Sequence, residues 1–274
     1  MTTLITGGTG KTGIRLARLI HAAGHPVLLT SRKGVAPDPF KVADGNIDKV
    51  YLVAPVVLDI LPVVKPFIEL AISKGVKKFV LLSASQMDKG SIYVGKIHEY
   101  LVERGVENTV LQNFGGFYLS SIRENNEIFS VTRDGPIPLI GADDIAKAAY
   151  DALFATNSAN TDYFLIGPEL FSYTEACSDL SLEFKQRMRL SQAAALLSET
   201  LGRKISHRHL TNDEEIAIFH QSGIPQERAA GLNHGESLIA EGAEEALVRH
   251  VKAITGVDKL KDHLEANKHL WIKE

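Results

Sequence analysis

Three glycines spaced three residues apart lie near the start of the chain, at Gly7, Gly10 and Gly13. Glycine lets a backbone turn sharply and approach an anion closely, and a helix predicted to begin near Lys11 would offer free N–H groups and a positive dipole end. A tight turn alone would also use glycine, but the position between a strand and a helix predicts a dinucleotide pyrophosphate site. The residues of this predicted loop are Thr6, Gly7, Gly8, Thr9, Gly10, Lys11, Thr12 and Gly13.

The residues after the second predicted strand indicate which dinucleotide is bound. An acid there would hydrogen-bond the ribose hydroxyls and favour NAD, but the chain has Ser31, Arg32 and Lys33. A hydroxyl and a guanidinium suit a 2′-phosphate, so we expect NADP(H), with Ser31 and Arg32 as ligands. The alternative is a solvated pair of basic loop residues. Ala54 and Pro55 follow the third predicted strand and are expected to line the adenine and ribose side.

Polar and aromatic side chains follow the next two predicted strands. Ser83 and Ser85 stand where a nicotinamide would lie, so we expect Ser83 to contact the cofactor and Ser85 to act at the reaction centre. Asn113, Phe114 and Phe117 are the predicted substrate-binding residues. An aromatic wall stabilises a cation by about 0.5–2 kcal/mol. The alternative is that the two phenylalanines simply pack in the core.

The elements that must position these residues alternate between strands and helices. This alternation predicts an α/β fold with a doubly wound parallel (Rossmann) sheet. Only the stretch 33–48 separates the second strand from the third, whereas a further βαβ step needs roughly 30 residues. One strand and one helix are therefore missing or much reduced. Strands are expected at 2–6, 26–31, 49–54, 77–83, 107–112 and 163–166, and helices at 11–23, 59–74, 95–104 and 143–154.

The pattern changes after Pro168 and becomes mostly helical. Two capping boxes, each a Ser or Thr followed three residues later by Glu, begin at Ser172 and Thr211. We therefore expect a dinucleotide-binding domain over 1–168 and a small helical substrate cap over 169–274. Within the cap, helical patterns are expected at 172–201 and 237–254, and an extended segment at 204–210.

Composition excludes several classes of protein. The chain has 274 residues with 30 Lys and Arg against 33 Asp and Glu, so no basic excess indicates nucleic acid binding. The single Cys177 excludes an internal disulfide, and no histidine pair has zinc-ligand spacing. The longest apolar stretch is interrupted by prolines and an acid, and the N-terminus lacks a basic signal-peptide region. We expect a metal-free cytoplasmic protein, monomeric or homodimeric, that acts on a small molecule away from membranes.

Several segments together resemble the NmrA-like, atypical short-chain dehydrogenases/reductases. The stretches 4–13 and 76–85 carry the general resemblance, and Gly95-Lys-Ile-His98, Asp143-Asp-Ile-Ala146 and Gly202-Arg-Lys-Ile205 resemble the ergot-alkaloid branch of festuclavine and agroclavine dehydrogenases. The resemblance spans almost the whole chain. It implies an NADP-dependent oxidoreductase that reduces an iminium or a related C=N or C=C bond.

The acid–base residues depart from the usual short-chain dehydrogenase pattern. That pattern is Tyr-x-x-x-Lys, in which the lysine lies one helical turn after the tyrosine and lowers its pKa. Here Ile92 stands four residues before Lys96, and Tyr93 stands three before it. Tyr93 is the candidate proton donor, and Lys96 is a candidate catalytic residue that contacts the cofactor or the substrate. His98 is expected on the helix surface.

Two other functions remain open. NmrA-like relatives include NADP-binding regulators without turnover, and the absent Tyr-x-x-x-Lys pattern is compatible with such a sensor. A quinone or isoflavone-type reductase would share the same fold. Reduction of a ketone needs a proton, whereas hydride addition to an iminium gives a neutral amine directly, so the sequence favours an iminium reductase.

Overall fold

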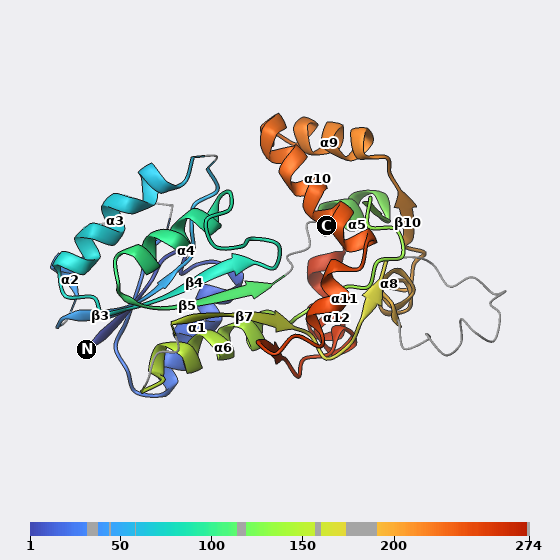
Figure 1. Ribbon diagram of the computed structural model, residues 1–274. Helices are drawn as coiled ribbons and strands as arrows, with labels where there is room; N and C mark the ends of the chain where they lie inside the picture. The colour runs from blue at the N-terminus through green and yellow to red at the C-terminus, as the bar shows by residue number, and fades with distance from the viewer. Residues whose placement is uncertain are drawn as a thin grey trace. The chain divides into compact units, whose positions relative to one another are not determined.

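The computed structural model in Figure 1 describes residues 1–31, 38–43, 45–57, 59–113, 119–156, 160–173 and 191–272. The chain separates into two compact units. The first comprises 1–113 with 142–165, and the second comprises 114–141 with 166–274. The expected division after Pro168 lies close to the boundary between Leu165 and Ile166, and the second unit takes in 114–141 as well.

The first unit is built on a parallel sheet. Its described strands pair in the order β7-β5-β4-β3-β1-β2, and each of these neighbours is parallel to the next. The predicted Rossmann sheet is therefore confirmed. The strands are β1 (Thr2–Ile5), β2 (Val27–Leu29), β3 (Ile47–Leu52), β4 (Lys78–Ala84), β5 (Glu107–Asn113) and β7 (Thr161–Ile166).

Helices cover both faces of this sheet (Figure 1). On one face, α3 (Leu61–Ser73) and α4 (Val94–Glu103) pack over buried strand residues such as Phe79 and Leu81. On the other face, α1 (Lys11–Ala22) packs against α6 (Ala142–Phe154). Both helices bury one apolar stripe, which is how an amphipathic helix docks on a sheet.

The connection from β2 to β3 is as short as the sequence predicts. Within its described residues the chain forms the four-residue helix α2 (Pro39–Val42), whose first turn is capped by the Asp38 carboxylate at 3.0 Å from Phe40 N. The next strand, β3, pairs with β1 on the side opposite β2. The chain thus reverses its direction of travel across the sheet at β1.

The second unit is mostly helical, as expected. Its two small parallel sheets pair β6 (Glu127–Ser130) with β10 (Ser206–His209) and β8 (Phe171–Ser172) with β9 (Ser191–Gln192). None of the helices in the described ranges of the chain is both long and apolar enough to cross a membrane. The other elements are α5 (Leu119–Asn125), α8 (Ala193–Leu201), α9 (Asn212–Gln221), α10 (Gln226–Ala240), α11 (Ala243–Leu247), β11 (Ala253–Thr255), α12 (Leu260–Ala266) and the 3₁₀ helix η1 (Lys268–Trp271).

Two helix predictions in this unit are wrong. The pattern over 172–201 does not form one helix, because Ser172 lies in β8 and Ser191–Gln192 form β9, which pairs with β8, so that helix α8 begins only at Ala193. The pattern over 237–254 is broken because Gly242 adopts a left-handed φ of 89° that ends one helix and begins another, and Ile254 lies in β11. The capping box at Thr211 is confirmed: its hydroxyl accepts from Glu214 N at 3.3 Å.

Candidate functional site

The glycine loop between β1 and α1 is shaped by contacts that leave no room for side chains. Gly7 has a φ of +60°, and Gly10 N donates to Gly7 O at 2.8 Å. A Cβ on Gly13 would lie 2.7 Å from Gly7 O and 2.9 Å from Gly8 Cα. Real Cβ atoms do not approach a backbone this closely, so a side chain at position 13 would push the loop open.

The first turn of α1 offers a site for an anion. Gly10 caps the helix without a side-chain hydrogen bond, and the turn contains no acidic residue. Because the first N–H groups of a helix have no intrahelical acceptor, those of Lys11, Thr12 and Gly13 can bind an external ligand. The exposed Thr9, Gly10 and Lys11 bring this end of the helix to solvent. The loop therefore fits the pyrophosphate that its sequence predicts.

The end of β2 lies against the glycine loop. Gly8 N donates to Thr30 O at 2.8 Å, and a Cβ on Gly8 would lie 2.7 Å from Leu29 Cβ. The half-buried Ser31 follows directly, at the place expected for the adenosine ribose. Arg32, the other predicted 2′-phosphate ligand, lies outside the described residues.

Thr6 joins the end of β1 to the chain after β3. Its hydroxyl accepts from Val53 N at 2.7 Å and donates to Val53 O at 3.0 Å. The half-buried Ala54 and Pro55 follow this link, so they stand next to the glycine loop. Because the hydroxyl is already bonded to Val53, the part of Thr6 that can meet a cofactor is its main chain.

A buried tyrosine hydrogen-bonds to a residue of the glycine loop. Tyr51, on β3, is fully buried and its hydroxyl donates to Thr12 Oγ1 at 3.4 Å. Burial raises the pKa of Tyr51 to about 12, because the phenolate would lose its hydration. Tyr51 therefore stays neutral and acts as a donor. Tyr51 is not among the predicted site residues, although a tyrosine in an apolar buried strand is a recognisable signal.

The carboxyl ends of β4 and β5 carry the predicted reaction-side residues. Ser83 and Ser85 are buried, with 8% and 7% of their surface exposed, and Asn113 is half-buried. Ser85 N donates to Asn113 O at 3.3 Å, so these two predicted residues lie side by side. Phe114 and Phe117 lie outside the described residues.

Tyr93 and Lys96 stand at the start of α4. Tyr93 immediately precedes the helix with φ 52° and ψ −122°, a conformation that favours glycine and costs about 1–3 kcal/mol for other residues. Lys96 N donates to Tyr93 O at 3.1 Å, and the Lys96 side chain is exposed. The expected surface position of His98 is wrong. His98 is 7% exposed, because α4 buries a broad face that includes Ile97 and Leu101.

Sheet topology brings these segments to one edge. Because parallel strands share the direction of their carboxyl ends, the ends of β5, β4, β3, β1 and β2 lie in that order along a single rim. The reversal of strand order at β1 is where ligands bind in open α/β sheets. The glycine loop, Ser31, Ala54, Ser83 and Ser85 therefore belong to one candidate site within the first unit.

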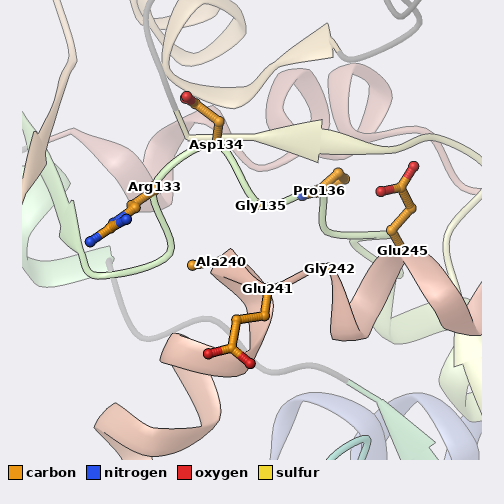
Figure 2. A pocket seen from close by; sticks show the side chains of 8 residues that line it. All are labelled: Arg133, Asp134, Gly135, Pro136, Ala240, Glu241, Gly242 and Glu245. Carbon is orange, nitrogen blue, oxygen red and sulfur yellow. The ribbon is translucent and has the colours of Figure 1, made fainter.

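A separate depression of about 380 Å³ lies in the second unit (Figure 2). Its lining mixes an arginine with acidic side chains and contains none of the predicted site residues. In the described part of the chain, no group of three or more His, Cys, Asp or Glu side chains could hold a metal ion. The lining residues are Arg133, Asp134, Gly135, Pro136, Ala240, Glu241, Gly242 and Glu245.

Comparison with solved structures agrees with this fold. The chain superimposes on the Citrobacter sp. triphenylmethane reductase, crystallised with NADP(H), with a TM-score of 0.63 and 17% identity. The match covers 98% of this chain and 99% of that one. At this identity the likeness concerns the fold alone.

Sequence comparison gives the family. No family model matches the chain. It is 35% identical to the agroclavine dehydrogenase of Claviceps fusiformis over 303 residues, covering 99% of each chain. It is also 35% identical to festuclavine synthase II of Penicillium roqueforti, covering 99% of this chain and 100% of that protein. Since 303 aligned positions exceed the 274 residues present, the relative has residues that this chain lacks. The chain belongs to the agroclavine and festuclavine dehydrogenase family.

Proposed function

We propose that this protein is an NADPH-dependent reductase that transfers a hydride to an iminium, or to a conjugated C=N or C=C bond, of a small molecule. The observation that carries the proposal is the glycine loop, in which Gly13 approaches Gly7 and Gly8 too closely for any side chain. The names of the relatives, agroclavine dehydrogenase and festuclavine synthase, support an oxidoreductase of alkaloid metabolism. The NADP(H) complex of the structural neighbour supports the choice of cofactor.

In this proposal, residues of the first unit would bind each part of the dinucleotide. Main-chain N–H groups of the glycine loop and of the first turn of α1 would hold the pyrophosphate. Ser31 and Arg32 would bind the 2′-phosphate, and Ala54 and Pro55 would line the adenosine. Ser83 would contact the nicotinamide half, with Lys96 as a further cofactor contact. When bound, NADPH supplies the hydride.

The reaction end of the site suits a substrate that arrives as a cation. Tyr93 and Lys96 are three residues apart, and Tyr93 precedes the helix instead of lying on it. Hydride addition to an iminium carbon places the electron pair of the C=N bond on nitrogen and yields a neutral amine, so it needs no proton donor. Ser85 and Asn113 would orient the substrate, together with Phe114 and Phe117. For substrates that do need a proton, Tyr93 is the candidate donor.

The test begins with binding and ends with turnover. Quenching or enhancement of NADPH fluorescence on titration with the protein should give a dissociation constant, and NADPH oxidation should then be followed with cyclic imines, enones and quinones. Turnover with cyclic imines supports the proposal. Binding without turnover of any substrate would instead indicate a nucleotide sensor, and turnover confined to quinones would indicate a quinone reductase.

Cofactor preference is tested separately. Arg32→Ala should weaken NADPH binding and spare NADH, because only NADPH carries the 2′-phosphate. A strong preference of the wild-type protein for NADH would contradict the assignment of Ser31 and Arg32.

A further inference from the structure

A buried glutamine on β5 binds the segment that leads from β4 into α4. Gln112 is 2% exposed, and its Nε2 donates to the main-chain oxygen of Met87 at 3.1 Å. Its register partner on β4 is Ser83, so both side chains lie on the same face of the sheet. Gln112 Oε1 and Ser83 Oγ are buried, and neither has a hydrogen-bond partner among the described residues.

The segment 85–93, which Gln112 contacts through Met87, is compact and strained. Gly90 N donates to Gly95 O at 2.9 Å, which folds the segment back on the start of α4. At Gly95 any side chain would clash, because its Cβ would lie 2.3 Å from Asp88 O. The segment ends at Tyr93, whose left-handed φ of 52° persists only where the surrounding contacts hold it.

We propose that Gln112 is a positioning residue for this segment, acting through the Nε2–Met87 O hydrogen bond to set Ser85 and Tyr93 against the substrate. The inference rests on the proposed function, since it concerns the reaction end of the same site. A buried amide is unfavourable unless its hydrogen bonds are used. The Gln112 side chain links β5 to the segment after β4 through its hydrogen bond to Met87 O.

Asn108 provides a matched control on the same strand. It is 3% exposed, lies on the same face of β5 four residues earlier, and its Nδ2 donates to Val106 O at 3.0 Å. Its Oδ1, like Gln112 Oε1, has no hydrogen-bond partner among the described residues. The two amides therefore have similar burial and bonding, but Asn108 lies at the amino end of the strand, away from the site.

The experiment compares Gln112→Met with Asn108→Leu, which replace each amide by an apolar side chain of similar size. We expect Gln112→Met to speed amide hydrogen exchange in peptides covering 85–93 of the cofactor-free protein. It should also lower kcat for a cyclic imine on the order of 100-fold, as small misplacements at a reaction centre do. The dissociation constant for NADPH should stay at its wild-type value, because the glycine loop holds the phosphates elsewhere. Asn108→Leu should change neither the exchange of 85–93 nor kcat.

The two proposals fail in different ways. If the wild-type protein binds NADPH without turnover, the reductase proposal fails, and hydrogen exchange still decides whether Gln112 holds the segment. Unchanged exchange of 85–93 in Gln112→Met would overturn the positioning role. Equal losses of kcat in Gln112→Met and Asn108→Leu would also overturn it, because both losses would then reflect general destabilisation.

Discussion

At the scale of single residues, the shape of the candidate site depends on glycines, because a side chain at these positions would clash with neighbouring atoms or strain the backbone. Gly7 supplies a left-handed φ, Gly8 leaves room for Leu29, and Gly13 lets the start of α1 approach Gly7 O. Each glycine therefore meets a different requirement of the same loop. The spacing of the glycines predicts a loop of this kind, but only the structure shows which neighbouring atoms a side chain at each position would clash with.

Gly13→Ala tests this crowding. The new Cβ would meet backbone atoms that cannot move without opening the loop, so we expect NADPH binding to be lost and unfolding free energy to fall by about 1–3 kcal/mol. Fluorescence titration and urea unfolding measure the two effects. Gly235→Ala is the matched control: nothing lies within 4 Å of its Cβ position on α10, so it should raise stability by up to about 1 kcal/mol and leave NADPH binding unchanged.

Tyr93→Phe separates hydride transfer from proton transfer. The variant keeps the ring and removes the hydroxyl. We expect kcat for a cyclic iminium to be unchanged, because the product amine needs no proton, and kcat for an enone to fall by about 100-fold or more if Tyr93 is the donor. Steady-state assays with both substrates check this. Equal losses with the two substrates would show that the hydroxyl holds the segment in place and does not transfer a proton.

At the scale of elements, the reversal of strand order at β1 places the site. β2 and β3 flank β1 on opposite sides, so the glycine loop emerges between their carboxyl ends. Thr6 then ties the end of β1 to Val53, after β3. The short β2–β3 connection leaves this crossing intact, because β2 is the last described strand on its side of the sheet, where the usual order of this fold has one further strand at the edge.

Thr6→Val tests the link between β1 and β3. Valine has the same shape but cannot accept from Val53 N, and an unsatisfied buried N–H costs about 1–3 kcal/mol. We expect a lower thermal unfolding midpoint and weaker NADPH binding, measured by circular dichroism and fluorescence titration. Thr6→Ser keeps the hydroxyl and should retain most of both. Wild-type affinity in Thr6→Val would show that the link does not shape the site.

At the scale of the whole molecule, two ionisable side chains with shifted pKa values, His207 and Glu215, lie in the second unit. His207 Nε2 lies 2.9 Å from Ser130 Oγ and packs edge-on to Tyr173. Glu215 is fully buried, accepts from Val131 N at 3.1 Å and Asn233 Nδ2 at 2.9 Å, and its carboxyl hydrogen-bonds Glu236. The chain has a single tryptophan, Trp271, and it lies in this unit, so its fluorescence reports unfolding there.

His207 makes the unfolding free energy depend on pH in the acidic range. Burial first, and then the neighbouring His209, lower the pKa of His207 from 6.5 to about 4. Between these values the unfolded chain binds a proton that the folded chain does not, so unfolding free energy should fall as pH drops from 6.5 to 4. Urea unfolding followed by Trp271 fluorescence measures this. His207→Gln removes the titration, and a pH dependence as steep as that of the wild type would contradict the assignment.

Glu215 makes the unfolding free energy depend on pH in the opposite direction. Burial raises its pKa, so its protonated form is favoured in the folded protein. The contribution of Glu215 to the unfolding free energy is fully present below the pKa that this carboxyl has in the unfolded chain. It is lost as the pH rises through the raised pKa of the folded protein. Glu215→Gln, which mimics the protonated carboxyl, should make Trp271-monitored stability less sensitive to rising pH. A steeper loss in the variant would contradict this.

The local sequence was sufficient to predict elements whose signals lie within a few residues. The glycine loop, helix α1, the capping box at Thr211 and the shortened β2–β3 connection all follow from spacing and periodicity, because turns, caps and helices are made by near neighbours. The family resemblance was likewise visible in short motifs. Ser31, Ala54, Ser83 and Ser85 stand at or just after the ends of strands, and because parallel strands end at one edge, the sequence predicts that these residues lie along the same edge.

Only the tertiary structure decided what depends on distant partners. His98 is buried because α4 packs on both the sheet and α3, and the helix expected over 172–201 is interrupted because β9 pairs with β8. The links from Thr6 to Val53 and from Gln112 to Met87 join residues far apart in the chain. Local patterns carry no record of such pairings, since burial and hydrogen bonding are satisfied by whichever segment the fold brings near.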